Sequence, residues 1–182
     1  METISTEVKQ VINTTTIETP LGTMLAGATE QGICLLEFTE RAILNREFND
    51  LTRLLKAEII EGENMHFQLL RNELNKYFNG NLKKFEVPLV IAGTGFQKEV
   101  WNELLKIPYG TTRSYKEQSI AINKLDAIRA VAAANGANRI AIIIPCHRVI
   151  GEDGSLTGYG GGLWRKKWLL DLEKGQLTLP TA

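Results

Sequence analysis

The sequence is poor in the side chains that build metal sites and disulfide frameworks. Its 182 residues include two cysteines, Cys34 and Cys146, and two histidines, His66 and His147. A structural zinc site needs four such ligands in close pairs, and these four are not paired in that way. Two cysteines form at most one disulfide, and in a reducing compartment we expect both to be free thiols. We therefore predict no metal site, and we expect Cys34 to be a buried structural thiol.

The chain also lacks long apolar runs and an excess of charge of either sign. Its apolar runs, of which residues 140–144 are an example, are too short to span a bilayer. Residues 1–7 are acidic and polar, unlike a secretory signal or a transit peptide, which predicts a cytoplasmic protein without membrane contact. Lys+Arg and Asp+Glu both number 21, but residues 94–182 hold 12 basic against 8 acidic side chains. This modest bias makes the second half the side expected to face a polyanion.

The first half of the chain predicts a small sheet with two helices. Residues 17–38 have the pattern of short strands punctuated by glycines. Apolar residues then recur at helical spacing over 41–60 and again over 65–78. Residues 91–95, with two glycines, are the best candidate for a linker between domains.

The second half has the pattern of a helix-turn-helix. Thr94 and Gln97 have capping-box spacing and open one helix. Two shorter helices are expected over 115–122 and 127–135, with Asp126 as the N-cap of the second. Two short helices joined by a four-residue turn are typical of this motif.

A wing and a last helix are predicted to follow. The pair Asp153 and Gly154 favours a β-hairpin between residues 149–150 and 156–157. A hairpin after a helix-turn-helix would form a wing. Helical periodicity then returns over 164–174.

The stretch Pro145-Cys146-His147-Arg148 has the clearest signs of chemistry. A thiolate is a strong nucleophile, but at an unperturbed pKa of about 8.5 few thiols are ionised at neutral pH. His147 and Arg148 could supply a base or a positive charge. Spacing argues against a phosphatase loop, because Glu152 stands where that loop requires Arg, and a papain-like protease would have only His66 as its distant histidine. On spacing alone, a nucleophile and a buried cysteine beside a satisfied histidine remain equally open.

The sequence resembles the methylated-DNA–protein-cysteine alkyltransferase family, and the resemblance covers roughly residues 17 to 175. The family's hallmark Pro-Cys-His-Arg-Val stands unbroken at 145–149. Further matches at the family's spacings are Thr19-Pro20-Leu21-Gly22, Tyr77-Phe78-Asn79-Gly80, Arg113-Ser114-Tyr115, Arg129-Ala130-Val131, Ala134-Asn135-Gly136-Ala137-Asn138, Leu156-Thr157-Gly158-Tyr159 and Lys167-Trp168-Leu169-Leu170 with Glu173.

The resemblance implies a role for each matching residue in a reaction on a flipped-out guanine. Cys146 matches the alkyl acceptor, His147 the base that deprotonates it through a water, and Glu173 the carboxylate that orients this histidine. Tyr115 matches the tyrosine that rotates the nucleotide and protonates the guanine. Arg129 matches the arginine that enters the base stack in place of the flipped base.

Four further residues match the surroundings of the family's site. Asn138 matches an asparagine that braces the turn before the cysteine. Tyr159 and Gly160 match the pocket rim, where the Gly160 N–H would donate to the guanine oxygen. Val149 would line the pocket through its backbone carbonyl. Arg139 departs from the pattern, because it stands where the family commonly has a proline.

Two features of the residues themselves bear on these roles but leave alternatives open. Glu173 lies in the last turn of a predicted helix, where a carboxylate opposes the helix dipole at a cost of about 0.3–1 kcal/mol. This suggests a partner elsewhere, although solvent exposure would explain it equally well. Residues 130–134 carry almost no side chain able to read base edges, which suits close approach to a minor groove. A helix buried in the core would explain them as well. Asn123 and Leu125 replace the usual glycine and proline of the preceding turn, which puts its rigidity in doubt.

We therefore expect an α+β fold: a small N-terminal antiparallel-sheet and helix (RNase H-like) domain at 1–90, a C-terminal winged helix-turn-helix domain at 94–175 and a tail at 176–182. The resemblance implies DNA repair by direct reversal, with stoichiometric, irreversible transfer of the alkyl group from O6-alkylguanine, and from O4-alkylthymine, to Cys146. It also implies double-stranded DNA with alkylated bases as partner, a monomer, and no metal or organic cofactor. The alternative is a non-catalytic lesion-binding or regulatory winged-helix protein.

Overall fold

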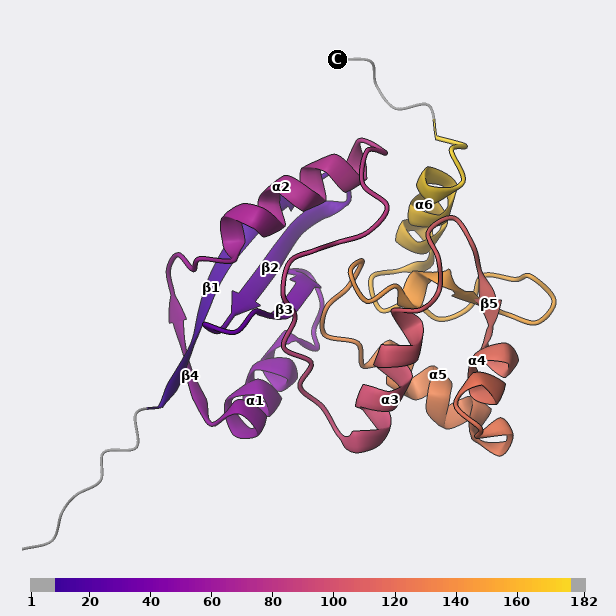
Figure 1. Cartoon of the computed structure of the whole chain (residues 1–182), viewed down its shortest axis with the longest axis horizontal. Coiled ribbons are helices and arrows are strands. Elements are labelled where there is room, and N and C mark those ends of the chain that lie inside the picture. The colour runs from indigo at the N-terminus through magenta and orange to yellow at the C-terminus, as the bar shows by residue number, and fades with distance from the viewer. Residues whose placement is uncertain (1–8, 178–182) are drawn as a thin grey trace, which may run out of the picture.

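The computed structural model of the chain describes residues 9–177, which form a sheet with two helices followed by a group of four further α-helices (Figure 1). The expectation for residues 1–7, and that for the tail beyond residue 177, lie outside this range. None of the helices within it has the length and the apolar character needed to cross a bilayer.

The N-terminal sheet has the strand order β3-β2-β1-β4. Neighbouring strands are antiparallel except for β1 and β4, which are parallel. The strands are β1 (Gln10–Thr19), β2 (Gly22–Ala28), β3 (Ile33–Phe38) and β4 (Ala57–Glu61). The predicted strands are therefore present, but the sheet is mixed rather than wholly antiparallel.

The helix predicted over 41–60 was too long. Helix α1 spans Leu44–Leu55, and Lys56 then adopts a left-handed φ of +48° that ends it. The next residues join the sheet as β4, with Ile59 opposite Ile12 of β1. The β-branched Ile59 favours an extended strand, and pairing with the edge of β1 outweighs the helical spacing.

The two faces of the sheet belong to different cores. Helix α2 (Phe67–Phe78) shares the larger core with one face and with the C-terminal helices. Helix α1 packs on a smaller core that contains Leu35, Leu51 and Cys34. Cys34 is 1% exposed, and burial raises the pKa of its thiol to about 12, as expected for an unreactive structural cysteine.

The C-terminal half begins with the predicted capping box. The side chain of Thr94 accepts from the Gln97 backbone at 3.2 Å, and the Gln97 side chain accepts from the Thr94 backbone at 3.0 Å. The helices that follow are α3 (Gly95–Leu104), α4 (Tyr115–Ala121), α5 (Ile128–Gly136) and α6 (Leu163–Glu173). Helices α4 and α5 form the predicted helix-turn-helix.

The turn between α4 and α5 differs from the prediction in one respect. Asp126 does not cap α5; it lies inside a short 3-10 helix, η1 (Leu125–Ala127), and the N-cap is Ala127 without a side-chain hydrogen bond. Asn123 has a φ of +56°, so it occupies the left-handed position for which the usual glycine is suited. Asparagine tolerates this conformation better than most residues, which explains its presence there.

The hairpin predicted for the wing is not formed. Residues 149–150 are strand β6 (Val149–Ile150), but this strand pairs in parallel with β5 (Arg113–Ser114). The turn itself exists, because the Gly151 N–H donates to the Ser155 carbonyl at 2.8 Å. The chain then leaves the expected hairpin path, and residues 157–160 line the pocket described below.

The free edge of β3 holds the segment that leads to Cys146. The Leu36 N–H donates to the Arg139 carbonyl and the Ala141 N–H donates to the Leu36 carbonyl, both at 2.8 Å. Arg139 adds a side-chain anchor, because its guanidinium donates to the Ala92 carbonyl at 2.8 Å and to Asp50 at 2.9 Å. The sheet thus fixes the position of the site from the other half of the chain.

Candidate active site

Cys146 stands at the end of a buried, strained turn. Ile142 in this turn has a φ of +72°, which a β-branched residue rarely adopts and which costs about 1–3 kcal/mol. Asn138 closes the turn: its Nδ2 donates to the Ile144 carbonyl at 2.8 Å, and its Oδ1 accepts from the Ile140 N–H at 3.0 Å. Asn138 thus connects two backbone positions of the turn, as a residue that braces it would.

The Cys146 thiol is partly exposed in the wall of a pocket. Its Sγ accepts a hydrogen bond from Asn138 Nδ2 at 3.3 Å. Burial raises the pKa of the Cys146 thiol, and the lowering by Asn138 is smaller. The thiol is therefore protonated at neutral pH, so its reaction as a thiolate requires a base.

His147 directly follows Cys146 and is the residue predicted to be that base. Its Nε2 lies 2.7 Å from Glu173 Oε1, and both side chains are fully buried. A carboxylate only accepts hydrogen bonds, so Nε2 holds the proton and Nδ1 has the free lone pair. Nδ1 has no hydrogen-bond partner among residues 9–177. Burial lowers the pKa of His147 more than the Glu173 contact raises it, which keeps the imidazole neutral at pH 7.

Glu173 is the centre of a larger buried network than the sequence predicted. Besides His147, it accepts from Arg148 Nε at 2.8 Å, from the Tyr77 hydroxyl at 2.7 Å and from the Gly110 N–H at 3.2 Å. Burial alone would raise the pKa of Glu173, but the hydrogen bonds from His147 and Arg148, with the charge of Arg148, outweigh it and lower the pKa strongly. The carboxylate at the end of α6 is therefore buried and paired, which excludes solvent exposure as its explanation.

A pocket of about 430 Å³ opens beside Cys146. Its volume lies in the range of about 300–1,000 Å³ that is common for small-molecule sites. Most of the predicted site residues meet here. The lining residues are Tyr115, Ile128, Arg129, Ala132, Asn135, Gly136, Cys146, Thr157, Gly158, Tyr159 and Gly160.

Tyr115 shares its hydrogen-bond acceptor with a lysine that the sequence reasoning missed. The Tyr115 hydroxyl donates to the Thr157 carbonyl at 2.8 Å, and Lys166 Nζ donates to the same carbonyl at 3.0 Å and to that of Gly158 at 3.2 Å. Burial lowers the pKa of Lys166 to about 8 and raises that of Tyr115. The sequence did contain a signal for this buried position. Lys166 precedes Leu169 by three residues and Leu170 by four, which places it on the apolar face of the helix.

Of the three other residues predicted at the pocket, Tyr159 and Gly160 line it and Val149 does not. The Tyr159 hydroxyl is buried without a partner among the described residues. Gly160 faces the pocket. Val149 is fully buried in β6 and is not among the residues that line the pocket.

Helix α5 is half exposed. Arg129, Ala130 and Ala133 are exposed, whereas Val131 and Ala134 are buried. The small residues therefore do not belong to a helix enclosed in the core. They form an outer face beside the pocket, and Arg129 lies at its rim.

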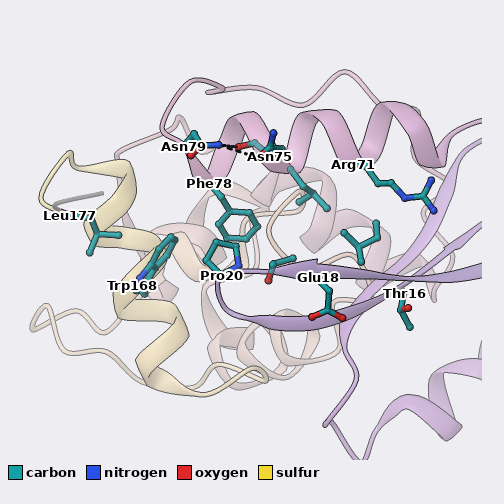
Figure 2. Close-up of a pocket in the computed structure, with 12 residues that line it drawn as sticks. Thr16, Glu18, Pro20, Arg71, Asn75, Phe78, Asn79, Trp168 and Leu177 are labelled. Carbon is teal, nitrogen blue, oxygen red and sulfur yellow. Dashed lines mark hydrogen bonds between the residues drawn. The ribbon is translucent and has the colours of Figure 1, made fainter. Parts of the chain in front are cut away.

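A larger groove of about 840 Å³ lies between the sheet and α6, and contains none of the predicted site residues. Figure 2 shows Phe78 and Trp168 in it, with Arg71 toward its far end. It brings together side chains of β1, α2 and α6 but no nucleophile. Its lining residues are Thr16, Ile17, Glu18, Thr19, Pro20, Arg71, Leu74, Asn75, Phe78, Asn79, Trp168 and Leu177.

Both halves of the chain match descriptions of one protein family. Residues 12–91 match "6-O-methylguanine DNA methyltransferase, ribonuclease-like domain", and residues 95–175 match "6-O-methylguanine DNA methyltransferase, DNA binding domain". These matches, with the helices and sheet described above, confirm the predicted fold class, although the strand pair expected for the wing is absent.

Whole-length relatives agree with these matches. A methylated-DNA–protein-cysteine methyltransferase of Methanosarcina barkeri is 45% identical over 162 residues, which are 88% of this chain and 96% of the relative. A crystal structure of Mycobacterium tuberculosis OGT in complex with DNA is 42% identical, with a TM-score of 0.76 over 91% of this chain and 94% of that one. The O6-methylguanine-DNA methyltransferase of Pyrococcus kodakaraensis is 26% identical, with a TM-score of 0.58 over 89% and 98%. The chain therefore belongs to the methylated-DNA–protein-cysteine methyltransferase family.

Proposed function

We propose that this protein repairs DNA by direct reversal, transferring the alkyl group of O6-alkylguanine, and of O4-alkylthymine, to Cys146. The observation that supports this most is a partly exposed thiol in a pocket of about 430 Å³, followed in the chain by a buried His147–Glu173 pair. The similar proteins are named for transfer from methylated DNA to cysteine, and one similar structure contains DNA. The protein acts as a monomer in the cytoplasm, where thiols stay reduced.

The proposed reaction exchanges the thiol proton for the alkyl group. His147 removes the proton from Sγ, through a water, and Glu173 stabilises the resulting imidazolium. Sγ then forms a bond to the alkyl carbon while the carbon–oxygen bond to the base breaks, and its electron pair stays on the base. The base takes up a proton, for which the Tyr115 hydroxyl in the pocket wall is the proposed donor. The thioether is stable, so each molecule acts once, and no metal or organic cofactor takes part.

The described residues suggest how DNA reaches the pocket. We propose that the domain at 94–175 binds double-stranded DNA through the exposed face of α5, while the domain at 1–90 supports the site and 176–182 is a tail. Ala130 and Ala133 allow the helix backbone to approach a groove closely without reading sequence. Arg129 projects at the pocket rim, where it can fill the space left by a flipped base.

Replacing Arg129 tests this arrangement. Arg129→Ala is expected to slow methyl transfer from a duplex by about tenfold to a hundredfold, because unstacking a base costs a few kcal/mol that the arginine offsets. Transfer from the free base O6-methylguanine should not change. Single-turnover rates with both substrates measure the two effects. An equal loss on the free base would place Arg129 in the chemistry rather than in base flipping.

The decisive test of the function is the mass of the intact protein after mixing with a duplex that contains one O6-methylguanine. We expect a gain of one methyl group per molecule, located at Cys146 by peptide mapping. Cys146→Ser should gain nothing, and the matched control Cys34→Ser should gain one methyl group. Tight binding of the duplex with unchanged mass would contradict the proposal and indicate a non-catalytic lesion-binding protein.

A further inference from the structure

The pocket loop at residues 158–161 is in contact with a charged side chain from the N-terminal half of the chain. Arg41 lies in the turn after β3, and its guanidinium is close to Gly160. A Cβ built on Gly160 would lie 2.7 Å from Arg41 Nη1 and closer still to Nη2. The φ of Gly160 is not in the left-handed region. A side chain at this position would therefore have to displace the Arg41 guanidinium, although the backbone conformation itself would accept one.

Arg41 is held in this place by a buried carboxylate. Its Nη1 pairs with Glu37 Oε2, and the side chains of Arg41 and Glu37 are 15% and 1% exposed. The other oxygen of Glu37 accepts from the Phe38 N–H at 2.9 Å. Glu37 lies in β3, so the guanidinium is anchored to the sheet and cannot swing away without leaving a buried charge unpaired.

Arg41 lines a small cavity together with Cys146. This cavity of about 10 Å³ is also lined by Glu37, Tyr159 and Gly160, among others. A space of this size holds at most about one water molecule. Burial is the main cause that raises the pKa of the Cys146 thiol, Glu37 raises it further, and the positive charge of Arg41 offsets only part of the effect of Glu37.

A second arginine, Arg165, also holds the pocket loop at residues 158–161. Arg165 donates to the Gly161 carbonyl at 2.8 Å and to the Leu21 carbonyl at 2.9 Å, so it ties the end of the loop to the β1–β2 turn. Arg41 contacts the loop one residue earlier, at Gly160, which lines the pocket. The two arginines therefore fix successive residues of the loop against the N-terminal sheet.

We propose that Arg41 is a positioning residue of the alkyl-transfer site: packed between Glu37 and Gly160, it sets where the pocket loop stands relative to the Cys146 thiol. This inference rests on the proposed function. It gives the N-terminal domain a direct part in the reaction geometry, although none of its side chains lines the pocket of about 430 Å³. The loop position matters because an error of about 1 Å in a reacting geometry can slow a reaction by about a hundredfold.

The first test separates chemistry from DNA binding. Arg41→Ala is expected to lower the single-turnover rate at saturating duplex by about tenfold to a hundredfold, with the duplex Kd changed by less than about twofold. Arg41→Lys keeps a charge beside Glu37 but loses the planar guanidinium, and it should also be slowed by about tenfold. The matched control Arg53→Ala removes an exposed arginine of the same domain and should change neither quantity. An unchanged rate in both Arg41 variants, or a loss in Kd alone, would overturn the proposal.

The second test uses the contact with Gly160. Gly160→Ala should slow transfer by about thirtyfold or more, because the new methyl group collides with Arg41. In the Arg41→Ala background the same substitution should cost less than about threefold, since residues in contact show non-additive effects. Equal losses in the two backgrounds would contradict the contact.

Hydrogen exchange of the amides at 158–161 provides a readout that does not depend on alkyl transfer. It should be faster in Arg41→Ala than in Arg53→Ala and the wild type, in the absence of DNA. A wild type that transfers no methyl group would refute the proposed function while leaving this measurement valid. Unchanged exchange would refute the role of Arg41 even if the wild type is active.

Discussion

Glu173→Gln is expected to lower the free energy of unfolding by about 3–5 kcal/mol and to slow alkyl transfer by about 10³–10⁴-fold. The amide keeps the shape of the side chain but removes the only carboxylate that pairs with Arg148 and His147 in the described part of the chain. Arg148 is then a buried charge without compensation, and His147 loses the partner that stabilises its protonated form. Urea unfolding and single-turnover rates at pH 7 measure the two effects.

The loss of stability should depend on pH in a defined direction. The pKa of Glu173 is lowered in the folded state, so its carboxylate contributes stability above its unfolded pKa of about 4.3, and this contribution is lost as the pH falls toward the folded pKa. The difference between wild type and variant should therefore shrink below pH 4. Glu103→Gln is the matched control, because Glu103 pairs with Lys106 and Arg113 away from the pocket. It should cost less, about 1 kcal/mol, because those partners are more exposed, and it should leave transfer unchanged. A Glu173 variant as stable as the control would show that the network does not hold the fold.

His147→Gln is expected to slow transfer at pH 7 by about 10²–10⁴-fold, the usual contribution of a general base. The pKa of His147 is lowered in the folded protein, so the wild-type rate should stay constant from pH 8 to below pH 6.5 and fall only at lower pH. In the variant, solvent must deprotonate the thiol, and burial raises the pKa of Cys146. Its residual rate should therefore rise about tenfold per pH unit through pH 8 and above.

The pH dependence of the transfer rate in His147→Gln distinguishes the loss of a base from general damage to the site. His66→Gln is the matched control, because His66 is the other histidine of the sequence and its ring is hydrogen-bonded to the Glu30 carbonyl at 2.8 Å, outside the pocket. The control should retain the wild-type rate and profile. A slow but pH-independent His147 variant would show that the histidine does not deprotonate the thiol.

Patterns between near neighbours in the sequence predicted most of the local structure. The capping box at Thr94 and Gln97 formed as expected, because both of its hydrogen bonds join residues three apart. The helix-turn-helix also formed. The prediction was wrong for residues 57–60. Their apolar spacing suits a helix, but the edge of β1 is open for pairing and favours a strand there. The hairpin predicted over 149–157 is also absent because contacts with distant segments outweigh the local pattern. Its turn is present, but β6 pairs with β5, and Tyr115 and Lys166 bind the carbonyl of Thr157.

The sequence predicted the residues of the site: a nucleophile within its motif, the histidine beside it, and a distant glutamate and tyrosine that match through a family resemblance. The surroundings of these residues became visible in the folded structure. It showed that Glu173 also binds Tyr77, 96 positions earlier in the chain, that Lys166 is buried, and that Arg41 stands behind Gly160. The difference comes from the separation along the chain between the residues that interact. Capping and strand alternation depend on residues a few positions apart, whereas a buried charge is placed by packing between elements that meet only when the whole chain has folded.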